Sequence, residues 1–241
     1  ELDGPLVDEY PGPGHRLIFD GLDRREVPPK NPSRRRKSWY EPKFEIGDAS
    51  DSAIRQSLLR VARKAFRRPV DGDDVARYET LYREELAHTG DVERALRTAI
   101  AAMFCSVDFL YLIEPEGRLD DHALASRLSY LLHRTSPDST LAAVADAGHL
   151  AGRPRDLLDQ TARLIRDEKF ERFIVDFTDA WLNLRDIDAT RPDQRLFPEY
   201  DEYLQDSMIR ETRATLRDLI IENRSIRDLV SSDRAMLNER L

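Results

Sequence analysis

The chain has 241 residues, of which 40% are apolar and 35% are charged, and it carries a formal net charge of -8 at pH 7. This excess of acidic side chains gives no overall attraction to phosphate backbones, so we do not expect the chain to bind nucleic acid. The single cysteine, Cys105, excludes an internal disulfide and a C-x-x-C-H haem-attachment motif, and no run approaches the roughly 20 apolar residues of a membrane span.

Residues 1–48 form the first predicted region. They are rich in proline and show no helical period, which favours extended segments and turns that lie as an irregular arm on the surface of a folded body. The chain opens without an initiator methionine or a leader sequence, and it stops at "SSDRAMLNERL" without a helix cap. We therefore expect a piece of a longer protein, with no signal peptide in this segment and a truncated C-terminal end.

Residues 49–118 form the second predicted region, a small helical subdomain. Its first helix carries apolar side chains at helical spacing, at Ile54, Leu58, Val61, Ala62 and Ala65. The sequence "RRPVDGDD" then ends this helix at Pro69 and offers Asp71 or Asp73 as the cap of the next one. The acidic residues of "DGDD" do not form an EF-hand calcium loop. Counted from Asp71, the positions that require glycine and glutamate hold Ala76 and Tyr82.

Residues 119–241 form the third predicted region, a larger helical subdomain. Leu124, Leu128, Leu131 and Leu132 predict the buried side of its first helix, whereas Ser126, Arg127 and Ser129 fall away from that stripe. Ser136 is the expected N-cap of the following helix.

A further alternative is that this chain binds haem without covalent attachment. Such binding would require His133 or Met103 to face an open apolar cavity.

Aromatic side chains follow one face of a later helix, in "KFERFIVDFTDAWLNL". They can form a cofactor wall or part of the core, and we interpret them as core because buried rings stabilise a fold strongly. The stripe consists of Phe170, Phe173, Ile174, Phe177, Trp181 and Leu184.

The segment "RDIDATRPDQRLFPEY" separates the last two long helices and shows no helical period. Loops of this length without structure of their own are often functional. Its charged side chains could converge on a ligand or a cation, or they could form surface ion pairs. They are Asp186, Asp188, Arg191, Asp193 and Arg195. The chain contains no phosphate-binding loop, nucleophile elbow or zinc-binding histidine motif that would identify an enzyme.

Two stretches of the chain resemble known domains. "ARKAFRRPVDGDDVARYETLY" with "AIAAMFCSVDFLYLIE" (62–114) resembles the domain of unknown function numbered fifteen ninety-five. "ASRLSYLLHRTSPDSTL", "DAWLNLRDID", "RETRATLRDLIIENRSIRDL" and "LNERL" (125–241) resemble its usual neighbour, numbered fifteen ninety-two. Polar positions that match these motifs are Arg127, Ser129, Asp138, Arg185, Glu211, Asn238 and Glu239.

The resemblance implies a parent protein of the planctomycete type that is exported to the periplasm or cell surface and that often carries a cytochrome-c-like module. Haem c would then be held by other modules, and no cofactor is expected in this segment. The expected partners are other domains of the parent protein, and a small-molecule or glycan ligand stays unspecified.

We therefore predict an all-α fold of about eight helices in two contiguous subdomains preceded by the proline-rich arm. The favoured function is that of a non-catalytic structural or interaction module in a redox-associated surface protein. The alternative is an enzyme or a glycan- or ligand-binding domain that uses the 185–195 loop with Arg127 and Glu211. The candidate ligand-binding residues are Arg127, Arg185, Asp186, Asp188 and Glu211.

Overall fold

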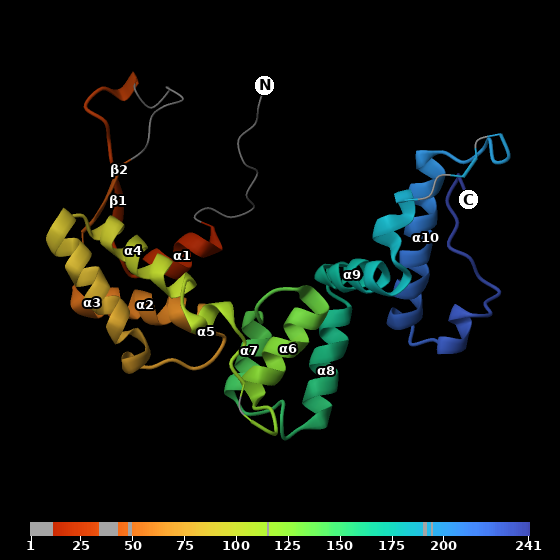
Figure 1. Ribbon diagram of the computed structural model, residues 1–241. Coiled ribbons are helices and arrows are strands. Elements are labelled where there is room, and N and C mark those ends of the chain that lie inside the picture. Colours follow the sequence, from red (N-terminus) through yellow and green to blue (C-terminus); the bar gives the residue numbers. More distant parts are fainter. Residues whose placement is uncertain (1–11, 34–42, 48–49, 115, 190–191, 194) are drawn as a thin grey trace. The chain divides into compact units, whose positions relative to one another are not determined.

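The computed structural model describes residues 12–33, 43–47, 50–114, 116–189, 192–193 and 195–241. The chain divides into two compact units, and the division along the sequence falls between Arg118 and Leu119 (Figure 1). The described residues form ten α-helices and a single two-stranded sheet, so the all-α prediction is confirmed. The sequence indicates about eight helices because the two shortest, α1 (Pro13–Phe19) and α5 (Val107–Leu110), span too few residues to show a period.

The first unit packs its helices around one apolar core. Its other elements are β1 (Arg24–Val27), β2 (Lys43–Ile46), α2 (Asp51–Phe66), α3 (Gly72–Thr89) and α4 (Val92–Phe104). Side chains with no exposed surface come from all three long helices, including Leu58 of α2, Val75 of α3 and Leu96 of α4. The helical spacing of the apolar residues therefore identifies the buried face of α2 correctly.

The described part of the proline-rich arm is more regular than its sequence indicates. Residues 13–19 form α1, with Pro13 in the first turn, where proline is tolerated because no backbone N–H is needed there. Phe19 and Leu22 are buried in the core of the first unit, and β1 pairs antiparallel with β2. The prediction of an irregular surface arm is therefore wrong for these residues, because apolar anchors override the local proline content.

Acidic side chains organise the connection between α2 and α3. Asp71 is the N-cap of α3 and accepts hydrogen bonds from the backbone N–H groups of Asp73 and Asp74. The Asp74 carboxylate accepts in return from the N–H of Asp71 at 3.0 Å and from Arg68 at 2.8 and 3.0 Å. The capping interpretation of "DGDD" is confirmed, with Asp71 rather than Asp73 as the cap.

The second unit, residues 119–241, contains the helices of the C-terminal half of the chain. Its elements are α6 (Asp121–His133), α7 (Ser139–Asp146), α8 (Pro154–Ile165), η2 (Glu168–Phe170), α9 (Glu171–Leu182), η3 (Leu184–Ala189), α10 (Glu202–Ile221) and η4 (Ile226–Leu229). The core is built from Leu132, Leu141, Leu164, Ile174 and Leu216, each from a different helix. The sequence segment "RDIDATRPDQRLFPEY" shows no helical period, yet its first residues belong to the 3-10 helix η3. This helix is too short to produce a recognisable period.

The buried face of α6 differs from the predicted leucine stripe. Ala125, Ser126, Ser129 and Leu132 are buried, whereas Leu131 is 60% exposed. Small side chains let neighbouring helices approach closely, so α6 buries its small-residue side together with only part of its leucine side. The prediction that Ser126 and Ser129 point away from the core is wrong for this reason.

The aromatic stripe of α9 is only partly core. Phe170 and Ile174 are buried, but Phe177 and Trp181 are 41% and 52% exposed. The rings of Phe173, Phe177 and Trp181 nevertheless contact one another, with centroids 5.4 and 5.5 Å apart. The core interpretation is therefore right for Phe170 and Ile174 and wrong for Phe177 and Trp181, because the C-terminal end of α9 extends beyond the core.

Asp138 joins three parts of the second unit. It is the N-cap of α7, in place of the predicted Ser136, and its Oδ1 accepts from the Leu141 N–H at 2.8 Å. Arg163 of α8 donates to both of its carboxylate oxygens, at 2.8 and 3.0 Å. Partial burial alone would raise the pKa of Asp138, but the hydrogen bonds from Arg163 and Leu141 outweigh it and lower the pKa.

We predict that Asp138→Ala lowers the free energy of unfolding by about 1–3 kcal/mol, because α7 loses its cap and Arg163 its partner. Since the folded-state pKa is lowered, this stabilisation is complete above the unfolded pKa of about 4 and disappears as the pH falls through the folded pKa. Urea unfolding of both proteins across pH 2–7 measures the difference, with the exposed Asp159→Ala as a control of little effect. An undiminished difference at the acidic end would contradict this role for Asp138.

Candidate functional site

One face of α10 carries polar side chains along its whole length. Ser207, Glu211, Thr215 and Asp218 follow at intervals of four, four and three residues, which places them on one side of the helix. After η4 the chain turns back, and residues 230–241, here called the C-terminal segment, run beside α10 toward its first turn (Figure 1). This polar face and the C-terminal segment enclose the candidate site.

Hydrogen bonds fasten the end of the C-terminal segment to the start of α10. The Asn238 side-chain amide donates to Ser207 Oγ at 2.9 Å, and the Tyr203 hydroxyl donates to Glu239 Oε1 at 2.9 Å. Arg240 donates at 2.8 Å to Oδ2 of Asp201, which is the N-cap of the helix. Ser207 is buried, whereas Asn238 is exposed, so this bond joins the surface segment to an interior side chain of α10. The two motif positions Asn238 and Glu239 therefore position the segment.

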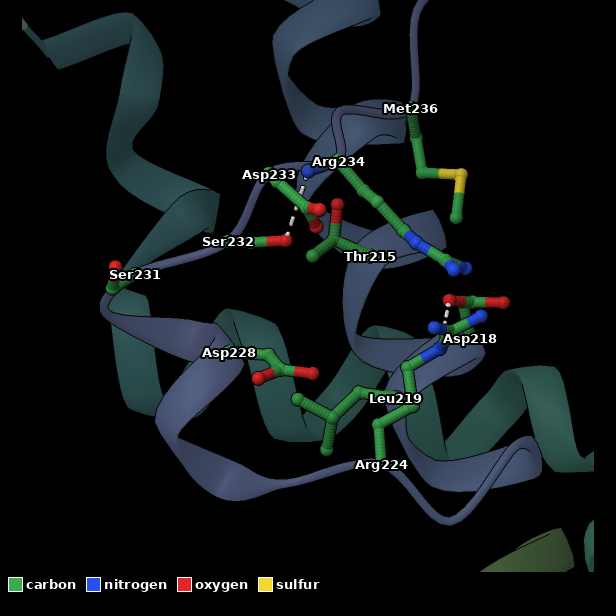
Figure 2. Close-up of a pocket in the computed structure, with 10 residues that line it drawn as sticks. All are labelled: Thr215, Asp218, Leu219, Arg224, Asp228, Ser231, Ser232, Asp233, Arg234 and Met236. Atoms are coloured by element: carbon green, nitrogen blue, oxygen red, sulfur yellow. Dashed lines mark hydrogen bonds and ion pairs between the residues drawn. The ribbon is translucent and has the colours of Figure 1, made fainter.

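A cavity of about 390 Å³ lies between the other end of α10 and the C-terminal segment. Thr215, Asp218 and Leu219 of α10 line it together with Arg224 and Asp228, and the C-terminal segment contributes Ser231, Ser232, Asp233, Arg234 and Met236. Figure 2 shows the Arg234 side chain reaching from the segment toward α10 across the cavity. The volume falls within the roughly 300–1,000 Å³ of small-molecule sites.

The charges that line this cavity are only partly paired with one another. Arg224 Nε lies 2.8 Å from Asp218 Oδ2, and both side chains are about three-quarters buried, at 27% and 28% exposure. Ser232 Oγ accepts from the backbone N–H of Arg234 at 3.1 Å and thereby shapes the turn. Within the part of the chain that the structure describes, the side chains of Asp228 and Arg234 form no hydrogen bond or ion pair. Both are thus available to a molecule in the cavity.

Arg185 belongs to a different group of charges. Asp179 of α9, with 12% of its side chain exposed, accepts from Arg213 of α10 at 2.8 Å and from Arg185 of η3 at 3.4 Å. Burial would raise the pKa of Asp179, but the hydrogen bond and charge of Arg213, followed by those of Arg185, outweigh it and lower the pKa. This group joins three elements and keeps Arg185 close to α9.

The residues predicted to form a ligand site lie on α6, η3 and α10. Arg127 is exposed on α6, Asp186 is exposed in η3, and Glu211 is half-buried on α10. No hydrogen bond or ion pair joins Arg185, Asp186 and Glu211 to one another in the described part of the molecule. The side chain of Asp188 lies outside the described residues, as does Arg191 of the same loop. These residues therefore remain predictions.

The same loop contains a local turn. Asp193 Oδ1 accepts from the backbone N–H of Arg195 at 2.8 Å, and the backbone N–H of Phe197 donates to the Asp193 carbonyl oxygen at 2.9 Å. One of the acids predicted for a ligand thus organises its own backbone.

The side chains considered for haem lie within the two cores. His133 and Met103 are 2% and 0% exposed, and His133 Nε2 lies 3.0 Å from the carbonyl oxygen of Leu164. Neither faces the cavity beside α10, whose lining includes no histidine. No group of three or more histidine, cysteine, aspartate or glutamate side chains in the described residues is arranged to hold a metal ion.

Sequence reasoning missed the residues of the cavity. Ser232 and Arg234 lie after η4 in a short polar stretch with no motif. Asp228 lies in η4 within the family motif "RETRATLRDLIIENRSIRDL", but nothing in the spacing of that motif marks it as a cavity residue. The signal that could have found them is the polar stripe of α10. A half-buried polar stripe on a helix indicates that another segment, or a ligand, covers it.

Two parts of the chain match known families. The family described as "PSD4: Protein of unknown function (DUF1592)" matches residues 119–241. The family described as "PSD5: Protein of unknown function (DUF1595)" matches residues 53–114. No curated protein and no solved structure matches the chain. Both resemblances noted in the sequence are confirmed, and neither description states an activity.

We expect Arg213→Ala to lower the free energy of unfolding by about 1–3 kcal/mol, because Asp179 then keeps only its longer contact with Arg185. Glu211→Ala should change it by no more than about 0.5 kcal/mol, because Glu211 has no described partner to lose. Chemical denaturation monitored by circular dichroism measures both values. Arg210→Ala, which removes an exposed pair with Asp206, is the matched surface control. An equal loss for Glu211→Ala and Arg213→Ala would show that Glu211 stabilises the fold.

Proposed function

The chain belongs to the PSD4 family of proteins of unknown function, and we propose that it acts as a non-catalytic interaction module of a larger protein. The supporting observation is the exposure of large apolar side chains on each of the two units. Large exposed apolar patches on folded proteins typically bind a partner.

The first of these surfaces lies at the end of the first unit, in residues 104–113, here called the apolar segment. Its exposed side chains are Phe104, Val107, Leu110, Tyr111, Leu112 and Ile113. Their backbone is held in place by Arg67, which donates to the carbonyl oxygens of Asp108, Phe109 and Tyr111 at 2.9–3.0 Å. The apolar segment is therefore a fixed surface, and a fixed surface loses less entropy when it binds.

The second surface lies at the end of α9 in the second unit. Phe177, Trp181 and Leu182 are all more than 40% exposed, and the first two rings contact each other. Aromatic side chains, tryptophan above all, are enriched among the residues that dominate binding energy at protein interfaces. Each unit thus offers its own apolar contact surface.

The resemblance to the two domains of unknown function indicates which partners the chain would bind. We propose that they are other domains of the parent protein, that this protein is exported to the periplasm or cell surface, and that haem c is bound by a cytochrome-c-like module elsewhere in it. In the described part of this chain, no helix has the length and apolar character needed to cross a membrane.

Replacing Leu110 and Ile113 with aspartate should weaken binding of this chain to the separately expressed remainder of the parent protein by at least about tenfold, because the charges must be desolvated at the interface. Isothermal titration calorimetry measures the dissociation constants. Leu158→Asp is the matched control, since Leu158 is equally exposed on α8 but lies outside the two proposed surfaces. Unchanged affinity in the double variant, or no binding by the wild-type chain, would contradict the proposal.

The intact parent protein should show the absorption spectrum of haem c and should fractionate with periplasmic or surface material. Both follow from the proposed redox-associated context. A haem-free parent protein or one confined to the cytoplasm would contradict that context, whereas it would leave the interaction surfaces to be tested by the calorimetry above.

A further inference from the structure

We infer that the cavity between α10 and the C-terminal segment binds a small neutral saccharide. This inference concerns a site distinct from the apolar surfaces proposed for domain contacts, and it does not depend on them. It rests on the mixture of donors, acceptors and aliphatic groups that line one cavity of suitable volume.

The charges of the lining exclude several other classes of ligand. Asp218, Asp228 and Asp233 contribute three carboxylates, while Arg224 and Arg234 contribute two guanidinium groups, which leaves one surplus negative charge. A phosphate or nucleotide would meet this negative surplus and is disfavoured. An apolar ligand would have to displace water from five ionised groups without replacing their hydrogen bonds.

A saccharide satisfies the same groups. Each sugar hydroxyl can donate to a carboxylate and accept from a guanidinium, and the forked geometry of arginine suits two neighbouring oxygens. Asp228 and Arg234 have no described partner, so they can form these bonds without first breaking internal ones. The hydroxyl groups of Thr215 and Ser231 offer both donors and acceptors at the walls.

The aliphatic part of the lining supplies the remaining contacts. Leu219 of α10 and Met236 of the C-terminal segment line the cavity together with the polar groups (Figure 2). They can pack against the C–H groups of a sugar ring, and methionine adapts its shape readily to such contacts. The volume of about 390 Å³ gives room for a monosaccharide or disaccharide.

The arrangement of the C-terminal segment supports a site that admits ligand. Residues 238–240 are bonded to the first turns of α10, whereas Asp233 and Arg234 are exposed at the rim of the cavity. The segment is thus fixed at its far end and solvent-accessible beside the cavity. Ligand can enter there without separating Asn238 from Ser207.

Titration of the full chain with sugars, followed by two-dimensional amide NMR, tests this inference. The probes are glucose, galactose, mannose, N-acetylglucosamine and cellobiose, with lysine and inorganic phosphate as charged comparisons. We expect saturable shifts for at least one sugar, confined to the amides of residues 215–219 and 228–236. If no sugar gives saturable shifts there, or if lysine or phosphate binds there more tightly than every sugar, the inference is wrong.

Variants of the two unpaired groups sharpen the test. Asp228→Asn and Arg234→Ala should each weaken sugar binding by about tenfold or more, because each removes a charged hydrogen-bonding group. Arg210→Ala is the matched control on the same helix, since Arg210 is paired with Asp206 and does not line the cavity. The amide spectra of the variants also report whether they are folded, and the exposed Arg234 can be replaced without disturbing any described contact. Undiminished binding in both variants would overturn the assignment.

Discussion

The contact between Asp179 and Arg213 fixes the rotation of α10, and the candidate site depends on that rotation. Residues two positions apart on a helix point in nearly opposite directions, so Arg213 facing α9 places Glu211 and Thr215 on the other side. Leu216 is buried on the same side as Arg213 and reinforces this orientation. The polar face of α10 is thereby turned away from the core, where the C-terminal segment covers it.

In the first unit, as in the second, apolar side chains form the core and charged side chains fix how the elements are positioned. Its apolar residues bury the faces of α2, α3 and α4, while arginines secure the connections. Arg68 contacts Asp74 and Asp108, and Arg24 contacts Glu93 while its guanidinium lies over the rings of Phe19 and Phe44, 4.7 and 3.4 Å from their centroids. The partly exposed pairs of Arg68 set geometry more than stability. Arg24 and Glu93 are both only 11% exposed, so the loss of either partner would leave a buried charge unpaired. Another arginine, Arg67, positions the apolar segment.

The sequence allows the fold class and most helices to be predicted, because the apolar spacing in α2 and the capping residues before α3 are local signals. It does not predict which face α6 buries, since Ser126 and Ser129 are buried by close helix packing that no spacing rule describes. Nor does it predict α1, whose helix is stabilised by distant contacts of Phe19. The candidate site is harder still: Asp228 lies in η4 and Arg234 lies in the segment that turns back after η4, and both reach the cavity beside α10 through tertiary contacts that no local pattern describes.

The central claim is that the C-terminal segment lies along the polar face of α10 and thereby forms the cavity. The most direct measurement is the nuclear Overhauser effect between the side-chain amide protons of Asn238 and the β-protons of Ser207 in the full chain. The account predicts a clear cross-peak, because the Asn238 nitrogen and Ser207 Oγ lie 2.9 Å apart. Absence of that cross-peak, together with random-coil shifts and fast amide exchange throughout residues 230–241, would contradict it.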